Sequence, residues 1–290
     1  MAGTSQAEPR RSAAKVGALL LALYQAAYRL GHAEFPGAAL ELLRHAIVFD
    51  GARWGCSHAG GRDLVFHDDL AQLSSADTSV QFDRNHLLIG ASEGWGGLVQ
   101  AIALYRMPEQ PAFQPGERRL GQFLAPHWIE ALKINRILQL EQFRAPLTAG
   151  SSGVAIADRH GWVHHSDAGF GNLLRSEWAH HLDHLLPAQL LHGLRKATEP
   201  RYLGSRLLID WMAGHGVYFL RARTRLPVDN LSARELAIAR EIAQGLTHKE
   251  IALKLGIAPS TVRNHLSAIH TRVRSRNNAE LAGSLRSAGY

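Results

Sequence analysis

The feature that most constrains this chain is a continuous pattern near its carboxyl end, residues 231–273, in which helix starts and stops alternate. Ser232 is followed by Glu235, and Thr247 by Glu250, with the S/T-x-x-E spacing of a capping box. In such a box the hydroxyl and the carboxylate satisfy amide groups that a helix start leaves exposed. The pattern therefore predicts two helices that begin at these boxes.

Glycine and proline mark the remaining boundaries of the pattern. Gly245 and Gly256 stand where these two helices must end, because glycine adopts the left-handed conformation without a steric penalty. Pro259 suits the first position of a third helix, where a backbone N–H has no partner in any case. The apolar side of that helix consists of Val262, Leu266, Ile269 and Val273 at helical spacing. The segment is thus predicted to fold as helix, turn, helix, turn, helix.

The opposite side of the third helix is polar and basic. It carries Ser260, Thr261, Arg263, Asn264, Ser267 and Arg274. A face this polar resists burial, and it suits the major groove of DNA, where Arg reads guanine and Asn reads adenine. We interpret it as a recognition helix; an ordinary solvated face on a small helical bundle is the alternative that helix spacing alone leaves open.

The complete pattern resembles the LuxR-type helix-turn-helix, also called the GerE domain. The resemblance rests on Leu231, Arg234, Glu235, Ala243, Gly245, the HKEIA of 248–252, Leu255, Ile257 and the STVRNH of 260–265. It implies base contacts from Arg263, Asn264 and Ser267. It also implies that four further side chains lie near phosphates: Lys249, Ser260, Thr261 and Arg272.

Some positions depart from the family pattern. Glu241 and Ser275 stand where an aliphatic residue is usual, and Ala239 replaces a larger residue. Ala258 replaces the usual hydroxyl cap, a loss that typically costs about 1 kcal/mol and that Pro259 partly offsets. These departures put in doubt the packing of the first helix and of the segment after the recognition helix.

Charge is concentrated in the same part of the chain. Residues 226–290 contain nine Lys and Arg against five Asp and Glu, a net charge of +4 out of the chain's +7. Phosphate binding predicts such a concentration, although a basic protein can also have a basic end for no such reason. With 290 residues and 46% hydrophobic content, the chain is long and apolar enough for two or three globular domains.

The amino-terminal half reads as an α+β sensor region. Residues 15–145 are predicted to hold a helix (38–47), strands (51–58, 62–67, 86–92, 99–107) and a long helix (116–144). This order loosely resembles a GAF-type sensor domain. Residues 1–14 are expected to be a disordered tail, followed by an amphipathic helix; Arg10-Arg11 and the apolar run after it only superficially resemble an export signal.

A second sensor unit is predicted over residues 146–225, ahead of the DNA-binding domain at 226–290. Its strands at 154–158 and 162–165 and a helix from about Asp167 resemble the opening of a PAS domain, with a closing hairpin at 203–210 and 216–223. The expected architecture is therefore two α/β sensor-like domains, GAF-like and PAS-like, followed by an all-α LuxR-type domain.

Candidate ligand-binding residues alternate along the first strand of the region. Trp54, Cys56 and His58 share one strand face, a plausible pocket wall for an unidentified small-molecule effector; a packed core with a partly exposed His58 is the alternative. Cys56 is the only cysteine, which excludes an intrachain disulfide and suits a reducing cytoplasm.

Metal, cofactor and catalytic sites are not predicted. His180 and His184 have the spacing of residues on one helical face, and His164 ends a predicted strand. No acidic partner at HExxH spacing and no nearby thiolate accompanies them. We therefore interpret the histidines as surface residues. We find no G-x-S-x-G elbow, P-loop or dinucleotide fingerprint, and the chain is not expected to be an enzyme.

The sequence thus predicts a cytoplasmic bacterial transcription regulator that binds double-stranded DNA and does not associate with a membrane. A homodimer on a roughly palindromic operator is expected. The candidate dimer seam lies on the long helix, at Leu120, Phe123, Leu124, Leu132 and Leu138, with packing inside the domain as the alternative. A ligand-binding or scaffold protein whose helical end contacts other proteins is the competing hypothesis.

Overall fold

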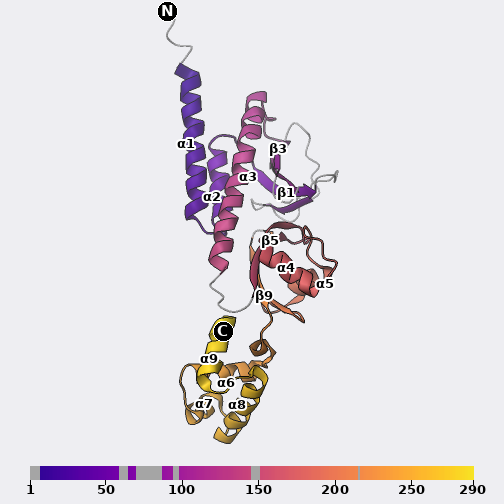
Figure 1. The fold of residues 1–290 in the computed structure, drawn as a ribbon. Coiled ribbons are helices and arrows are strands. Elements are labelled where there is room, and N and C mark those ends of the chain that lie inside the picture. Colours follow the sequence, from indigo (N-terminus) through magenta and orange to yellow (C-terminus); the bar gives the residue numbers. More distant parts are fainter. Residues whose placement is uncertain (1–6, 59–64, 70–86, 94–97, 145–150, 215) are drawn as a thin grey trace, which may run out of the picture.

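The computed structural model describes residues 7–58, 65–69, 87–93, 98–144, 151–214 and 216–290. Two units of helices and antiparallel sheet precede an all-helical unit, and the three follow one another along the length of the molecule (Figure 1). The predicted mixed α and β architecture with a helical carboxyl-terminal domain is confirmed at this level. Within the described ranges, no helix has both the length and the apolar character needed to cross a lipid bilayer.

The first unit places its helices beside one antiparallel sheet, with α3 between the sheet and the α1–α2 pair (Figure 1). Its elements are α1 (Ala7–Arg29), α2 (Phe35–Arg44), β1 (Gly51–His58), β2 (Val65–Asp69), β3 (Leu87–Glu93), β4 (Leu98–Tyr105) and α3 (Pro115–Phe143). The strand order is β2-β1-β4-β3. The helix α3 approaches β3 closely because Gly90 has no side chain: a Cβ there would lie 2.1 Å from the Cβ of Ala125.

The apolar side of α3 serves mainly this unit's own core. Leu124 and Leu132, which the sequence placed on a dimer seam, are 1% and 2% exposed and pack against α1 and the sheet. Leu120 and Leu138 are half-buried, whereas Phe123 is 52% exposed. The alternative of packing inside the domain therefore accounts for much of this helix, and Phe123 is left on its outer side.

The second unit is built on another antiparallel sheet. Its elements are β5 (Ser152–Asp158), β6 (Val163–Ser166), α4 (Ala168–Glu177), α5 (Ala188–Lys196), β7 (Arg201–Leu203), β8 (Leu207–Gly214) and β9 (Val217–Thr224). The strand order is β6-β5-β9-β8-β7. Asp167 caps α4 by accepting a hydrogen bond from Phe170 N at 2.8 Å, which places the helix start where the sequence predicts it.

The central strands of the second unit's sheet, β5 and β9, bury apolar side chains on both faces. Successive side chains of a strand point to opposite faces. Along β5, Val154 and Ile156 pack into the core of the first unit, whereas Ala155 and Ala157 pack beneath α4 and α5. The neighbouring strand β9 alternates in the same way. The first two units therefore share a continuous apolar core.

Several boundaries differ from the sequence-based prediction. The helix α1 begins at Ala7, so residues 7–14 are helical and do not belong to a disordered tail. This stretch contains Ala, Glu and Arg, which favour helix formation. Its proline lies in the first turn, where a helix tolerates proline. The helix α2 starts three residues early because Pro36 suits its first turn. The elements α5 and β7 were not expected, and residues 62–64 of one predicted strand lie outside the described residues.

A buried ion pair attaches the helical unit to the second sheet. The unit comprises η4 (Pro227–Asn230), α6 (Ala233–Ala243), α7 (His248–Leu255), α8 (Pro259–Val273) and α9 (Asn278–Ala288). Arg223 of β9 donates two hydrogen bonds of 2.6 Å to the carboxylate of Asp229 in η4, and both side chains are almost inaccessible. The hydroxyl of Tyr290 donates to Asp229 at 2.9 Å and accepts from Arg201 of β7 at 3.0 Å. The carboxyl terminus lies on the side of the unit that faces the second sheet (Figure 1).

This ion pair makes stability depend on pH. Burial raises the pKa of Asp229, but hydrogen bonds from Arg223, Leu226 N and Tyr290 outweigh it, so the pKa lies below its ordinary value. A lowered pKa stabilises the fold above the unfolded value of about 3.9, and this contribution disappears as the pH falls through the folded value.

We expect Asp229→Asn to lower the free energy of unfolding at pH 7 by about 3 kcal/mol or more, because it leaves the buried Arg223 without its counter-charge. The difference from the native chain should begin to shrink as the pH falls below about 3.9, where the unfolded chain takes up a proton, and should disappear only once the pH has passed the lowered pKa of the folded carboxylate. Urea unfolding at pH 7 and at a series of pH values below about 3.9 measures it. The matched control is Asp183→Asn, which removes an exposed partner of Arg175 and should change stability little. Equal effects of the two substitutions would contradict the assignment.

Candidate nucleic-acid interface

Two capping boxes fix the starts of α6 and α7. Ser232 N donates to the carboxylate of Glu235 at 2.9 Å, and Glu235 N donates back to the Ser232 hydroxyl at 3.3 Å. Thr247 N donates to Glu250 at 2.7 Å, with the reciprocal bond at 3.4 Å. Both predicted boxes are confirmed. They satisfy amide groups within one turn of sequence, so the helix starts do not depend on distant parts of the chain.

The two helices end at the predicted glycines. Gly245 has φ +89° and Gly256 has φ +65°, both in the region that favours residues without a side chain. The turn after Gly256 leads to Ala258, which caps α8 without a side-chain hydrogen bond, and to Pro259 in the first turn. The arrangement sets α7 and α8 as consecutive helices joined by a tight turn.

The helix α8 is anchored by its apolar side and leaves its polar side in solvent. Val262 and Ile269 are fully buried, and Leu266 and Val273 are each 7% exposed, in a core shared with α6, α7 and α9. On the other side Ser260, Arg263, Asn264 and Ser267 are exposed, and Thr261 is half-buried. Lys249, at the start of α7, is also exposed. The side chains of α8 that the sequence assigned to DNA thus lie together on the accessible side of this helix, and Lys249 is accessible on α7.

Arg272 differs from the other predicted contact residues. Its guanidinium forms an ion pair with Glu235, the carboxylate of the first capping box, while 44% of the Arg272 side chain remains exposed. Hydrogen bonds from Ser232 and this ion pair lower the pKa of Glu235. Arg272 therefore ties the end of α8 to the start of α6, a structural role that sequence spacing did not reveal.

Two departures from the family pattern have local explanations. Glu241 forms an ion pair with Lys254 at 2.7 Å, which joins α6 to α7 on the surface where an aliphatic contact is usual. Ser275 forms a hydrogen bond of 2.8 Å with Nδ1 of His270, just after Arg274 ends α8 with φ +61°. Polar contacts thus replace apolar ones at both positions, and the helices keep their packing.

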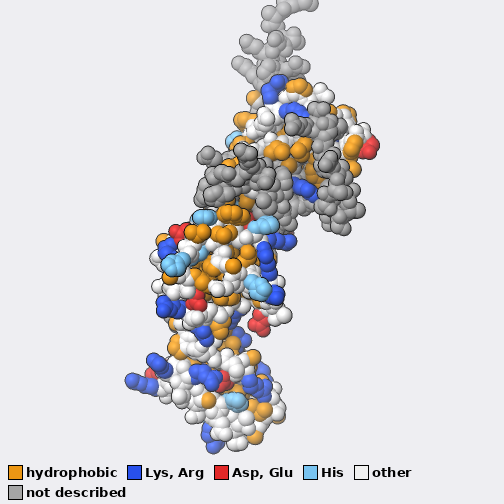
Figure 2. Space-filling model, turned by 90° about the vertical axis from the view of Figure 1, so that its right-hand side faces the viewer, with side chains coloured by type: hydrophobic (Ala, Val, Ile, Leu, Met, Phe, Trp, Pro, Cys, Tyr) orange, Lys and Arg blue, Asp and Glu red, His pale blue; other side chains and the backbone are white. Residues whose placement is uncertain are grey.

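Positive charge predominates on the view of the helical unit in Figure 2, where Lys and Arg side chains are spread over its surface with less Asp and Glu among them. The ion pairs of Arg272 and Lys254 neutralise part of this charge. Arg263 and Lys249 remain exposed. Electrostatic attraction to a phosphate backbone is consistent with this distribution.

The predicted effector residues lie at the junction of the first two units. Trp54 and Cys56 are 1% and 2% exposed. The Trp54 ring lies 5.5 Å from the ring of His164 in the second unit, and the guanidinium of Arg136 stacks over it at 4.3 Å. The side chain of His58 lies outside the described residues. The strand face that the sequence singled out is therefore buried against the second unit.

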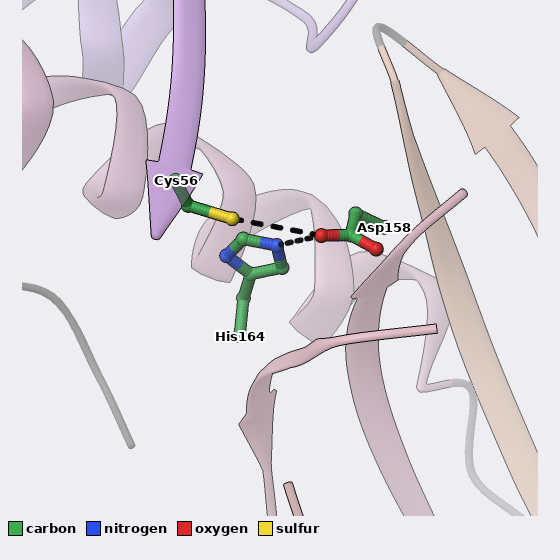
Figure 3. Close-up of side chains that lie close together, drawn as sticks. All are labelled: Cys56, Asp158 and His164. Carbon is green, nitrogen blue, oxygen red and sulfur yellow. Dashed lines mark hydrogen bonds and ion pairs between the residues drawn. The ribbon is translucent and has the colours of Figure 1, made fainter. Parts of the chain in front are cut away.

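A polar cluster occupies this junction (Figure 3). Cys56 Sγ donates to Oδ2 of Asp158 at 3.7 Å, and Nε2 of His164 is 3.1 Å from the same oxygen. All three side chains are buried. The interpretation of the histidines as surface residues is therefore wrong for His164, which burial with Trp54 and Asp158 removes from solvent. His180 is exposed, but it lies with His184 in the connection between α4 and α5 and not on a helix.

Sequence reasoning missed Asp158 as a partner of Cys56. The residues are 102 positions apart, and only the packing of the second sheet on the first unit brings them together. The available signal was an acidic residue ending an otherwise apolar strand directly before the turn at 160–161. Such a residue must find hydrogen-bond donors if the strand is buried.

Two curated bacterial proteins are similar to part of this chain. The transcriptional regulatory protein UhpA of Escherichia coli K12 is 41% identical over 54 residues, which are 19% of this chain and 28% of that protein. The nitrate/nitrite response regulator protein NarL of Escherichia coli K12 is 33% identical over 96 residues, 33% of this chain and 44% of that protein. The chain thus spans less than half the length of these curated relatives.

Similarity to solved structures is weak. The phage VqmA–DPO complex is 16% identical with a TM-score of 0.22, covering 55% of this chain and 91% of that one. A TM-score this low does not establish a shared fold. Residues 229–285, by contrast, match the family described as bacterial regulatory proteins, luxR family. This part of the chain is a LuxR-type helix-turn-helix domain, homologous to the corresponding domains of UhpA and NarL.

Proposed function

We propose that this protein is a bacterial transcription regulator that binds specific DNA sequences through α8. The observation that carries the proposal is the division of α8 into a buried side, with Val262 and Ile269 inaccessible, and an exposed side with Arg263 and Asn264. A recognition helix needs both: the apolar side holds it in the domain, and the polar side enters the major groove. A regulator of this kind acts on the chromosome, in the cytoplasm.

Each exposed side chain has a proposed role. Arg263 and Asn264 contact base edges, where a guanidinium pairs with guanine and an amide with adenine, and Ser267 adds a third contact. Lys249, Ser260 and Thr261 contact phosphates, which position the helix without reading sequence. Arg272 remains a phosphate contact in this proposal only through the part of its guanidinium that Glu235 leaves exposed.

The amino-terminal units are proposed to sense a signal. In the second unit the first strand, β5, lies in the sheet between β6 and β9, an order expected of PAS folds. The first unit, with an antiparallel sheet and a long helix against it, supports a GAF-like relation. We propose that an effector acts where these units meet, around Trp54 and Cys56, and that the chain has no catalytic activity.

A homodimer is proposed to bind a roughly palindromic operator. Leu21 and Tyr28 of α1 are 61% and 65% exposed and lie seven residues apart, which places them on one side of the helix. Phe123 of α3 is also exposed. A second copy packed on these helices would bury these apolar side chains and pair two α8 helices with half-sites about one DNA turn apart, or 34–36 Å.

Removing the base-reading guanidinium should reduce specific affinity. We expect Arg263→Ala to weaken binding to a duplex selected from a random-sequence pool by about 1–3 kcal/mol, and to relax preference at one base position. Fluorescence anisotropy with the selected duplex and its single-base variants measures both effects. Arg286→Ala, which removes an exposed arginine on α9, is the charge-matched control. Unchanged specificity in Arg263→Ala would refute the assignment of the reading face.

Removing a phosphate contact should act on all duplexes alike. We expect Lys249→Ala to weaken binding to selected and random DNA by the same factor, and to reduce the slope of log affinity against log salt by about 1. Titrations at several salt concentrations give the slope. A loss confined to the selected duplex would show that Lys249 reads bases.

The same titrations separate the regulator from the competing scaffold hypothesis. A regulator binds DNA with steep salt dependence and prefers the selected duplex over random DNA. If the native chain shows neither property, the exposed face of α8 contacts protein instead.

A further inference from the structure

The cluster at the junction of the first two units has the composition of a metal site. Its members are a thiol, a carboxylate and an imidazole: Cys56 on β1, Asp158 at the end of β5 and His164 on β6 (Figure 3). Their ligand atoms all lie within 4.8 Å of one another, and the side chains are at most 2% exposed. Sulfur, nitrogen and oxygen donors of these types are the ligands that Zn²⁺ takes in proteins.

The separations fit a tetrahedral ion. Bonds of 2.0–2.3 Å at tetrahedral angles put neighbouring ligand atoms about 3.3–3.6 Å apart. Asp158 Oδ2 lies 3.7 Å from Cys56 Sγ and 3.1 Å from His164 Nε2. These two separations are within a few tenths of an ångström of the tetrahedral values, and the third, between Sγ and Nε2, is at most 4.8 Å. One ion can therefore replace the two hydrogen bonds that now meet at Oδ2 once the side chains close around it.

The carboxylate is already oriented for this role. Oδ1 of Asp158 accepts hydrogen bonds from His160 N at 2.8 Å and from Trp162 N at 3.0 Å, in the turn between β5 and β6. These bonds leave Oδ2 directed at the other two side chains. Hydrogen bonds that hold a ligand in one orientation are typical of metal sites, because they fix the geometry before the ion binds.

We propose that Cys56, Asp158 and His164 bind a divalent transition-metal ion, with Zn²⁺ as the preferred ion, between the first and second units. The carboxylate supplies one oxygen and Cys56 supplies a thiolate. His164 supplies Nε2, so the proton that Nε2 donates to Asp158 in the metal-free protein moves to Nδ1 when the ion binds. One proton, that of the thiol, is released to solvent for each ion bound. A water molecule takes the fourth position.

The protonation states without metal agree with an exchangeable ion. Burial, the charge of Asp158 and its hydrogen bond raise the pKa of the Cys56 thiol to about 12, so the metal-free thiol keeps its proton at neutral pH. Burial lowers the pKa of His164, which leaves the imidazole neutral and able to act as a ligand. Neither group needs a counter-ion until a metal ion enters.

Arg136 limits the affinity of the site. Its guanidinium is buried over Trp54, and its charge acts on both Cys56 and His164. A positive charge this close to the ligands opposes a second cation, so it makes binding of the metal ion weaker than in a site without the arginine. We therefore assign the ion a regulatory role, since a weakly held ion can exchange with its surroundings.

The ion would join two units that already contact each other through apolar side chains, hydrogen bonds and the ion pair between Arg144 and Asp167. One ligand comes from the first unit and two from the second, so bound metal fixes β1 relative to β5 and β6. Metal binding itself does not depend on the proposed function; only its consequence for DNA binding does. The two proposals can therefore be tested separately on the same protein.

Cobalt spectroscopy of the metal-free full-length protein tests the site. Titration with Co²⁺ should give a thiolate-to-cobalt charge-transfer band and intense tetrahedral d–d bands that saturate at one equivalent, and Zn²⁺ should displace them. Cys56→Ser should abolish the charge-transfer band. Asp158→Asn and His164→Gln should each weaken Co²⁺ binding at least tenfold. His180→Ala, which removes an exposed histidine of the same unit, should leave the titration unchanged.

A measurement on the native chain removes the dependence on variants that fail to fold. X-ray absorption of the Zn²⁺-loaded protein should show one sulfur ligand at about 2.3 Å. Absence of sulfur, or a cobalt band that survives in folded Cys56→Ser, would overturn the proposal and leave the cluster as a hydrogen-bonded junction. Salt-dependent DNA binding by the same metal-free sample would show that the regulator proposal stands independently of that result.

Discussion

The fold of the first two units depends on two neighbouring strands, β5 and β9, whose apolar side chains are buried on both faces of their sheet. Strand alternation sends Val154 and Ile156 into the first unit's core and Ala155 and Ala157 under α4 and α5. Burying a large aliphatic side chain contributes about 1.5–3 kcal/mol, so neither face can be uncovered cheaply. The small alanines let the helices approach on one face, while the larger side chains fill the space on the other. The first two units are consequently one packed body, although the chain order suggests separate domains.

Polar contacts determine how the two units fit together in detail. Apolar packing tolerates sliding more readily than hydrogen bonds do, because it has no directional preference. The carboxylate of Asp158 accepts from the thiol of Cys56, from His164 and from two amides of its own turn. A buried carboxylate that loses such partners is strongly destabilised. The cluster therefore specifies one relative position of β1 and β5, and a ligand that replaces its hydrogen bonds acts on that position directly.

Local signals in the sequence predicted the helical unit well and the junction poorly. The capping boxes at Ser232 and Thr247 and the glycine ends involve groups at most a few residues apart, so spacing alone identifies them. The pairs Arg272–Glu235 and Cys56–Asp158 are separated by 37 and 102 residues, and no periodicity encodes them. The helix α5 was missed because its apolar side rests on little more than Leu190 and Leu194, too short a pattern to recognise.

The difference between local contacts in the helical unit and long-range contacts at the junction affects how a signal could reach DNA. The helix-turn-helix is held by contacts within its own sequence, so in the proposed regulator a signal from the first two units acts on its position more than on its shape. Strand β9 contributes Phe219 to the core shared by the first two units and, four residues on, Arg223 to the ion pair with Asp229. A displacement at the junction is therefore carried along one strand to the attachment point of the helical unit. In the proposed dimer the two α8 helices must match half-sites one DNA turn apart, so a shift of a few ångströms in each unit is enough to gain or lose the second half-site.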